Sequence, residues 1–196
     1  MYLIWNRFKY VLSPQFDIYD VIKKVVRNKV ADIGFGTGFG THLLNVNAKE
    51  VYGYEIDENA IQFAKAVFPF RNLHYEYGDI VKGISGQEFN YIVMIDVLEH
   101  IKDEKSALEN VKKMMTKDGT LILSTPNRLS RYRKGESHVR EYAPKELEGI
   151  LKRHFVSVSI RNYRLEPLAG QYENPLIAVC RNDETVPQSA KEKSNG

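Results

Sequence analysis

The chain has 196 residues, of which 43% are hydrophobic and 27% are charged, and its net charge is +3. This size and balance indicate one globular domain with short appendages, large enough to fold without a disulfide or a structural metal. The mild positive charge does not by itself indicate a nucleic-acid partner, and the single cysteine, Cys180, excludes an internal disulfide and a cysteine-cluster metal site.

The N-terminal residues 2–12 are aromatic and basic, with Arg7 and Lys9 inside an apolar stretch. They lack the small-residue cleavage site of a signal peptide, and no apolar run in the chain is long enough to span a bilayer. We therefore expect a soluble cytoplasmic protein. Apolar residues then recur at helical spacing, which predicts a helix over residues 17–27 whose buried face is formed by Ile18, Val21, Ile22, Val25 and Val26.

Five short apolar runs follow, separated by amphipathic segments. We expect these segments to form helices, one around Ile61 and Ala64 and one over residues 107–115. Strands that alternate with helices form right-handed βαβ units and a parallel sheet. The predicted parallel strands are residues 30–33, 51–54, 73–77, 91–95 and 121–124.

The last third of the chain has a different pattern. Pro144 suits the first turn of a helix, and the strands predicted at residues 156–160 and 173–181 are joined without room for a helical crossover. The chain therefore predicts an α/β fold with a seven-stranded mixed sheet, made of five parallel strands and a closing antiparallel pair, with helices on both faces. We expect an N-terminal extension and helix at 1–28, the domain at 29–181 and a disordered tail at 182–196.

The strongest local signal is the sequence Asp-Ile-Gly-Phe-Gly-Thr-Gly-Phe-Gly at residues 32–40. Glycines directly after a strand, at the start of a helix, form a cradle for a polar ligand at the carboxyl edge of a sheet. The spacing does not match the dinucleotide fingerprint, because Phe39 and Thr41 stand where a third glycine is needed, and no lysine makes it a P-loop. A glycine turn without a ligand is the alternative.

This loop resembles motif I of the class I S-adenosylmethionine-dependent methyltransferases. Residues 51–57, 77–80 and 89–100 resemble further motifs of that family, in the same order. The resemblance covers roughly residues 26–181 and implies a Rossmann-like fold, with S-adenosylmethionine as cofactor and S-adenosylhomocysteine as product.

The resemblance also implies which residues contact the cofactor. Glu55 would accept hydrogen bonds from the two ribose hydroxyls, and Asp79 would accept one from the adenine amino group. Phe35 stands where cysteine or alanine is frequent, so its ring would either narrow the methionine end of the pocket or pack against the neighbouring helix. The implied set is Asp32, Gly34, Phe35, Gly36, Thr37, Gly38, Glu55, Ile56, Asp79, Ile80, Asp96 and Val97.

Two histidines are the predicted catalytic residues, and no residue is assigned to a metal. His100 follows the fourth strand beside the expected methyl position, and its ordinary pKa suits a general base; orientation of Glu99, or capping of the next helix, is the alternative. His138 lies in a stretch that resembles one over the substrate site of quinone- and sugar-type methyltransferases. The predicted substrate-binding residues are Glu99, Arg140 and Tyr142.

The sequence Asp96-x-Leu98-Glu99-His100 resembles the version of motif IV found in small-molecule methyltransferases. We therefore expect direct in-line methyl transfer to an oxygen, nitrogen or carbon nucleophile on a small molecule. The basic loop at residues 127–144 would recognise an anionic acceptor or form a solvated lid. It also motivates one alternative, an RNA or protein methyltransferase; a non-catalytic S-adenosylmethionine-binding protein is another. Residues 2–12 would cover the cofactor cleft, or lie on a membrane surface.

Overall fold

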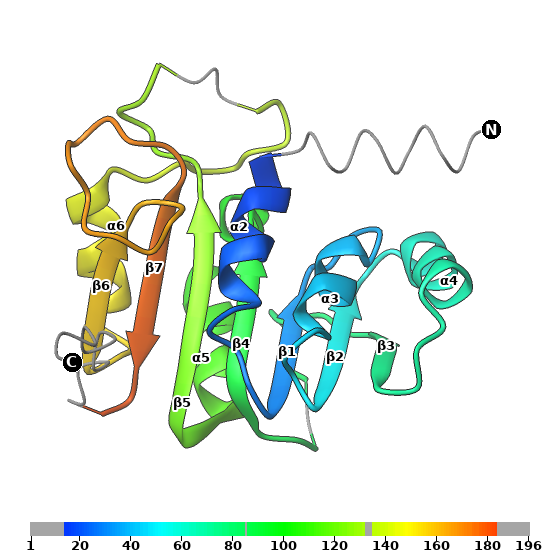
Figure 1. The fold of residues 1–196 in the computed structure, drawn as a ribbon. Helices are drawn as coiled ribbons and strands as arrows, with labels where there is room; N and C mark the ends of the chain where they lie inside the picture. The colour runs from blue at the N-terminus through cyan, green and yellow to red at the C-terminus, as the bar shows by residue number, and fades with distance from the viewer. Residues whose placement is uncertain (1–13, 85, 132–134, 184–196) are drawn as a thin grey trace, which may run out of the picture.

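A computed structural model of the chain describes residues 14–84, 86–131 and 135–183, and its centre is a seven-stranded sheet in the order β3-β2-β1-β4-β5-β7-β6 (Figure 1). The strands are β1 (Lys29–Ile33), β2 (Glu50–Glu55), β3 (Leu73–Tyr77), β4 (Phe89–Ile95), β5 (Met115–Thr125), β6 (Ser157–Arg161) and β7 (Leu176–Arg181).

Five α-helices and one short 3₁₀ helix connect or flank the strands. They are α2 (Pro14–Ile22), α3 (Phe39–Leu44), α4 (Glu58–Val67), η1 (Leu98–His100), α5 (Glu104–Met114) and α6 (Pro144–Leu151). None of these helices, which are those of the described ranges, combines the length and the apolar content that a passage through a lipid bilayer requires.

The pairing of the strands confirms the predicted mixed sheet. β1 pairs in parallel with β2 and β4, β2 with β3, and β4 with β5, whereas β7 lies antiparallel between β5 and β6. β1 is therefore the strand at which the order reverses, since β2 and β4 lie on its two sides. In an open parallel sheet a crevice forms at this point, beyond the carboxyl ends of the strands.

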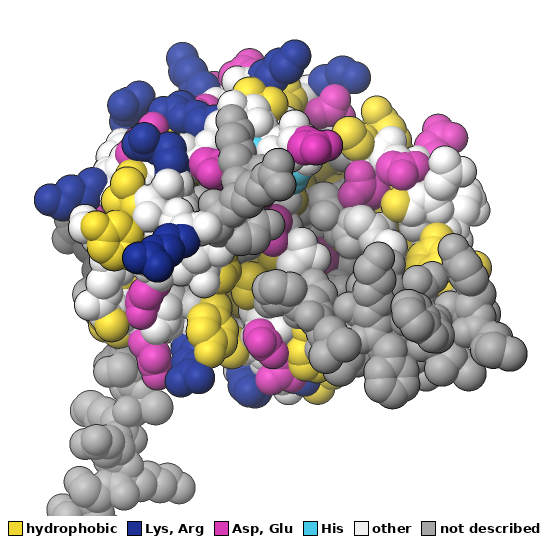
Figure 2. All heavy atoms as spheres, turned by 90° about the horizontal axis from the view of Figure 1, so that it is seen from above, with side chains coloured by type: hydrophobic (Ala, Val, Ile, Leu, Met, Phe, Trp, Pro, Cys, Tyr) yellow, Lys and Arg dark blue, Asp and Glu magenta, His cyan; other side chains and the backbone are white. Residues whose placement is uncertain are grey.

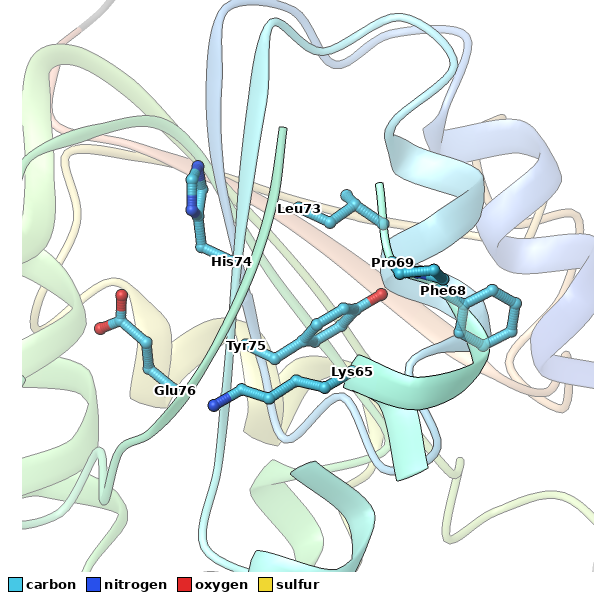
Figure 3. A pocket seen from close by; sticks show the side chains of 7 residues that line it. All are labelled: Lys65, Phe68, Pro69, Leu73, His74, Tyr75 and Glu76. Carbon is cyan, nitrogen blue, oxygen red and sulfur yellow. The ribbon is translucent and has the colours of Figure 1, made fainter. Parts of the chain in front are cut away.

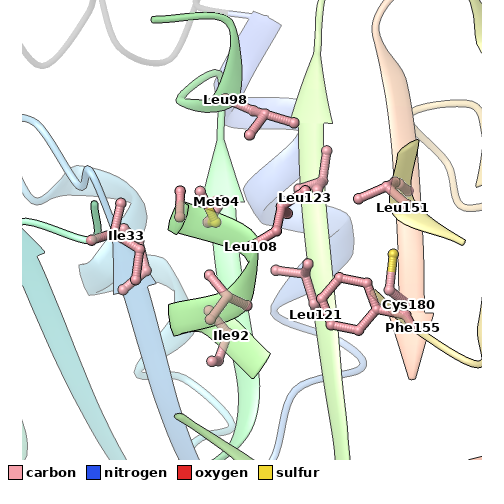
Figure 4. Packing of buried hydrophobic residues seen from close by; sticks show 14 of the residues in the cluster. Ile33, Ile92, Met94, Leu98, Leu108, Leu121, Leu123, Leu151, Phe155 and Cys180 are labelled. Atoms are coloured by element: carbon pink, nitrogen blue, oxygen red, sulfur yellow. The ribbon is translucent and has the colours of Figure 1, made fainter. Parts of the chain in front are cut away.

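Side chains of the central strands alternate between two apolar cores, one on each face. In β4, Ile92 and Met94 pack with residues of α5 and α6, while Val93 and Ile95 pack with residues of α2, α3 and α4. Figure 4 shows part of the first core, where Met94 lies beside Leu108 of α5. A strand buried on both faces reads as a continuous apolar run, which is why β4 was the most apolar of the predicted strands.

The helix predicted at residues 17–27 is shorter than expected and begins earlier. α2 ends at Ile22, and the chain then turns towards β1, with the N–H of Val25 donating to the carbonyl of Ile22 over 3.0 Å. Val25 is 40% exposed, so its assignment to the buried face is wrong, whereas Val26 is fully buried. The apolar pattern did not indicate that the helix ends at Ile22, because Val26 is buried from within the turn that follows the helix.

Several further boundaries differ from the prediction by one or more residues. Met115 begins β5 instead of ending α5, and β7 begins at Leu176 instead of residue 173. Asn174 precedes β7 and contacts the loop after β5, where its side-chain oxygen accepts a 2.7 Å hydrogen bond from the N–H of Asn127. The aromatic segment 2–12 and most of the predicted tail lie outside the described residues.

Candidate functional site

The glycine loop leaves β1 at the point where the sheet order reverses and leads into α3. Gly34, Gly36 and Gly38 have φ angles of +69°, +56° and +80°, which side chains rarely adopt. A Cβ at Gly34 would lie 2.6 Å from Val97, and one at Gly38 equally close to Ala64. At Gly36, by contrast, a Cβ would have no atom of the described residues within 4 Å. The main chain at Gly36 is therefore open to a ligand.

Glu55, the last residue of β2, holds the open part of this loop. Its Oε2 accepts a 3.0 Å hydrogen bond from the N–H of Gly36, and its Oε1 accepts from the N–H groups of Ile56 and Asp57 at 2.8 and 3.2 Å. These bonds orient the carboxylate towards the crevice between β1 and β2. The structure therefore brings together Gly36 and Glu55, as predicted from the motifs.

The first of two cavities along the crevice has a volume of about 370 Å³ and is lined by Glu55, Ile56, Asp79, Ile80 and Val97, among others. Burial alone would raise the pKa of Asp79, but the side chain of Lys82, 3.2 Å away, and the N–H groups of Val81 and Lys82 outweigh it and lower that pKa. Asp79 is therefore an ionised hydrogen-bond acceptor at the wall of this cavity.

The second cavity, of about 260 Å³, extends from Gly34 towards α2 and α3 and is lined by Gln15, Phe16, Tyr19, Gly34, Phe35, Gly36, Thr37, Phe39, Gly40, Ile95 and Asp96. Gly34 and Asp96 line both cavities. The two spaces therefore adjoin each other across the carboxyl ends of β1 and β4. The α2 residues Gln15, Phe16 and Tyr19 were not predicted, because nothing in their local sequence distinguishes them from other amphipathic helix residues.

Asp96 lies where the two cavities meet and has a positive φ of 54°. Its Oδ1 accepts a 2.6 Å hydrogen bond from the hydroxyl of Ser124, and its Oδ2 accepts one of 3.0 Å from the side-chain amide of Gln15. Residues other than glycine adopt this conformation at a cost, and such residues gather at functional sites. The surrounding hydrogen bonds keep the carboxylate of Asp96 at the junction.

Asp32, a predicted cofactor contact, is fully buried and lines neither cavity. Its two carboxylate oxygens accept hydrogen bonds from the hydroxyls of Tyr19 and Thr41, at 3.0 and 2.7 Å. Burial raises the pKa of Asp32 to about 7, against the lowering effect of these two bonds. Asp32 thus connects β1, α2 and α3 beneath the glycine loop.

Phe35 is also buried, with 5% of its surface exposed. Its ring lies against Gly53 of β2, where a Cβ would come within 2.6 Å of it, and 5.2 Å from the ring of Tyr75. The ring of Phe35 therefore packs against β2 and β3, and Phe35 also lines the second cavity.

Beside the first cavity, η1 and the loop after β5 bring Glu99, His100 and His138 together. The rings of His100 and His138 are 5.0 Å apart. The Nδ1 of His100 lies 3.1 Å from the carbonyl of Ser137, and that of His138 lies 2.7 Å from Oε1 of Glu141. His100 lines the cavity that contains Val97 and Asp96. The two predicted catalytic histidines are thus neighbours in space.

Glu99 is the most buried member of this cluster. Its Oε2 accepts a 3.1 Å hydrogen bond from the hydroxyl of Thr125, while its Oε1 has no hydrogen-bond partner among the described residues. Burial raises the pKa of Glu99 to about 8, and the negative charge of Asp96 adds to the effect. The carbonyl of Glu99 accepts from the N–H groups of Val139 and Arg140, which holds the loop over η1.

The other two predicted substrate residues, Arg140 and Tyr142, lie away from both cavities. Arg140 forms ion pairs with Glu104 and Glu146, each at 2.7 Å. The hydroxyl of Tyr142 donates a 2.7 Å hydrogen bond to Glu104, and Tyr142 is fully buried. These residues hold the loop against α5 and α6.

The basic character of this region is partly neutralised by acidic neighbours. Arg128 also pairs with Glu146, at 3.0 Å, while Arg133 and Lys134 lie outside the described residues. Figure 2, which looks down onto this edge of the molecule, shows Lys and Arg side chains gathered towards one rim and acidic side chains beside the histidines nearer the middle.

A further hollow lies between α4 and the edge strand β3, away from the carboxyl ends of the central strands (Figure 3). It is lined by Lys65, Phe68, Pro69, Leu73, His74, Tyr75 and Glu76, none of which is a predicted site residue. The crevice beside the glycine loop therefore remains the candidate site.

Comparisons with known proteins identify the family of the chain. The sequence profile of the family described as "Methyltransferase domain" matches residues 25–164. The chain is 25% identical over 130 residues to a probable S-adenosylmethionine-dependent methyltransferase of Mycolicibacterium smegmatis, covering 63% of this chain and 49% of that protein. It is 26% identical over 130 residues to the ubiquinone biosynthesis O-methyltransferase of Haemophilus ducreyi, covering 62% and 52%.

The chain thus spans about half the length of these curated relatives. Among solved structures, the DhpI–SAH complex superposes with a TM-score of 0.70 at 18% identity, covering 88% of this chain and 86% of that chain. A likeness at this identity shows the fold.

Proposed function

Since the chain belongs to the methyltransferase-domain family of class I S-adenosylmethionine-dependent methyltransferases, we propose that it transfers a methyl group from S-adenosylmethionine to a nucleophile on a small molecule. The observation that carries the proposal is the open main chain at Gly36, which lies beside the Glu55 carboxylate and lines the second of the two adjoining cavities. When bound, S-adenosylmethionine supplies a methyl group activated by a sulfonium, in line with the attacking nucleophile.

The residues of the crevice fit this ligand. Glu55 is fixed by three N–H groups and retains acceptor capacity for vicinal ribose hydroxyls. Asp79 is ionised at the wall of the first cavity, where it can accept from an adenine amino group. Gly36 leaves room for a ligand at the main chain, a feature that a side chain would remove.

Three kinds of contribution make up the proposed cofactor site. Ile56, Ile80 and Val97 provide apolar walls to the first cavity, and Asp96 lies at its junction with the second. Asp32 supports the glycine loop indirectly, by accepting hydrogen bonds from the hydroxyls of Tyr19 and Thr41. The remaining proposed contacts are Gly34, Phe35, Gly36, Thr37, Gly38, Glu55 and Asp79.

We place the methyl acceptor beside Glu99, His100 and His138, where the loop after β5 covers η1. The two histidines are the proposed catalytic residues, which assist loss of the acceptor's proton. Arg140 and Tyr142 are proposed to position the acceptor site, because they hold this loop to Glu104. Support for a small acceptor comes from the relative named as a ubiquinone biosynthesis O-methyltransferase.

Calorimetric titration with S-adenosylhomocysteine, followed by incubation of the protein with S-adenosylmethionine and a panel of hydroxylated metabolites, tests the proposal. We expect one binding site, and formation of S-adenosylhomocysteine that depends on an acceptor. Absence of binding would refute the cofactor site. Binding without turnover over a broad panel would favour the non-catalytic alternative.

A further inference from the structure

Glu99, His100 and His138 form a group with the composition of a metal site. Each offers one ligand atom, and the three atoms all lie within 4.8 Å of one another. η1 supplies Glu99 and His100, and the loop after β5 supplies His138. No metal ligand could be predicted from the sequence because these residues lie in two distant segments and form no spacing motif.

The hydrogen bonds of the two histidines are those of metal-binding imidazoles. A ligating histidine commonly donates its other ring N–H to a carbonyl or a carboxylate, which fixes the tautomer. Here Nδ1 of His100 lies 3.1 Å from the carbonyl of Ser137, which only accepts, so a proton on Nδ1 leaves Nε2 of this ring as a free electron-pair donor. Nδ1 of His138 lies 2.7 Å from Oε1 of Glu141 and 3.3 Å from the N–H of Gly135. Because a carboxylate only accepts, the shorter contact favours a proton on Nδ1 of His138, which leaves its Nε2 free as well.

Glu99 provides an independent observation. The residue is fully buried, and its Oε1 has no hydrogen-bond partner within the described part of the chain. A buried polar atom without a partner costs free energy and calls for an explanation in the structure. Since Oε2 is already bonded to Thr125, a cation held jointly with the two histidines would satisfy the remaining oxygen.

We propose that Glu99, His100 and His138 bind a divalent transition-metal ion of the Zn²⁺ type. Two imidazoles and one carboxylate suit such ions, whereas Mg²⁺ and Ca²⁺ prefer oxygen ligands throughout. Three protein ligands also leave a coordination position open, as in catalytic zinc sites. Bonds of about 2.1 Å in tetrahedral geometry place ligand atoms about 3.4 Å apart, so the group needs to contract by little more than about 1 Å.

The open coordination position of the ion bears on the methyl acceptor, and this inference rests on the proposed function. His100 lines the same cavity as Asp96 and Val97, so the ion would lie at the acceptor end of the crevice. There it selects acceptors with a hydroxyl or phenol group, whose pKa falls on coordination. The O–H proton leaves to solvent, and the oxygen electron pair forms the bond to the methyl carbon as the carbon–sulfur bond breaks. His100 and His138 then activate the acceptor as ligands of the ion.

The test measures metal binding by the full chain directly. After incubation with ZnCl₂ and dialysis, we expect about one retained ion per chain, and CoCl₂ should give visible absorption bands of a low-coordinate Co²⁺ site. An excess of MgCl₂ should displace neither. Glu99→Gln and His138→Gln should each weaken Zn²⁺ binding by at least about tenfold, while His74→Gln, at the distant edge strand, should leave it unchanged.

Retention of no zinc, or equal retention by the His138→Gln chain, would overturn the proposal. His138 lies in a loop, so this variant decides the matter even if Glu99→Gln fails to fold. Titration with S-adenosylhomocysteine separates the two levels of inference: cofactor binding without zinc binding removes the metal site alone, whereas zinc binding without cofactor binding removes the proposed function and keeps the site.

Discussion

At the residue scale, Gly36 and Glu55 show how a carboxylate can hold a glycine-rich loop in place through a main-chain N–H. The N–H of Gly36 donates to Glu55 across the gap between β1 and β2. Because the same carboxylate is also fixed by its own strand end, the open loop has one preferred position before a ligand arrives. Such preorganisation lowers the entropy cost of binding.

Gly36→Val is expected to lower affinity for S-adenosylhomocysteine by at least about tenfold, because its side chain would occupy the open space beside the main chain. Gly86→Val is a matched control, since Gly86 also has a positive φ and no described atom near a Cβ position. Both substitutions place a side chain at a positive φ, +56° at Gly36 and +101° at Gly86, so both cost backbone strain of at least about 1–2 kcal/mol. Equal affinities of the two variants in calorimetry would contradict the site.

Asp32 predicts a pH dependence of stability. Its pKa is about 7 in the folded protein and about 3.9 in an unfolded chain, so the folded state binds the proton more tightly. The contribution of Asp32 to stability is therefore fully present below about pH 4 and is lost, by up to about 4 kcal/mol, as the pH rises from about 4 to 7. Asp32→Asn retains partners for Tyr19 and Thr41 without the charge, and should remove this fall.

Urea unfolding of the wild type and of Asp32→Asn between about pH 4 and 8 measures the effect, and the difference between the two curves isolates Asp32 because Glu99 titrates in both. Asp118→Asn, at an exposed position, should leave the curve unchanged. A constant difference across the pH range would show that Asp32 is not the titrating group.

At the element scale, the loop from residue 135 to 143 takes its position from contacts at both ends. Its N–H groups at Val139 and Arg140 donate to the carbonyl of Glu99 in η1. Its side chains Arg140 and Tyr142 reach Glu104, at the start of α5. The loop is thereby connected to the strand end that carries the proposed acceptor site.

Tyr142→Phe should destabilise the protein by about 1–3 kcal/mol, because it removes a buried hydrogen bond to a carboxylate while retaining the ring. Tyr172→Phe, at a residue that is 65% exposed, should change the free energy of unfolding by less than about 0.5 kcal/mol. Urea unfolding at neutral pH compares the two variants. Losses of the same size would mean that the Glu104 contact does not stabilise this loop.

At the scale of the whole molecule, charge pairing bears on the RNA-methyltransferase alternative. The net charge is only +3, and Arg128 and Arg140 of the basic loop form ion pairs with Glu104 and Glu146. We expect no measurable binding of single-stranded RNA by fluorescence anisotropy at about 50 mM salt, with cofactor binding on the same sample as control. Affinity that falls steeply towards about 200 mM salt would instead favour that alternative.

The family and the mixed sheet were predictable because the signals are local. Glycines after β1 and acidic residues after β2 lie at strand ends, and parallel strands bring their carboxyl ends to one edge. The contacts of Asp32 could not be predicted for a physical reason: the motif marks it as important, but the hydroxyls of Tyr19 and Thr41, which donate to its two oxygens, come from segments whose packing no local pattern reveals. The contacts of Arg140 and Tyr142 could not be predicted for the same reason, since their partner Glu104 lies on another helix.

The groups proposed for the cofactor and part of the proposed acceptor site come from different stretches of chain. Nearly all groups proposed for the nucleotide precede residue 98, whereas His138 and the loop over η1 follow β5. Chimaeras that exchange the C-terminal half between relatives would therefore preserve the methyl donor while changing the acceptor. Such an arrangement lets recombination change the methyl acceptor while the contacts to the methyl donor are retained.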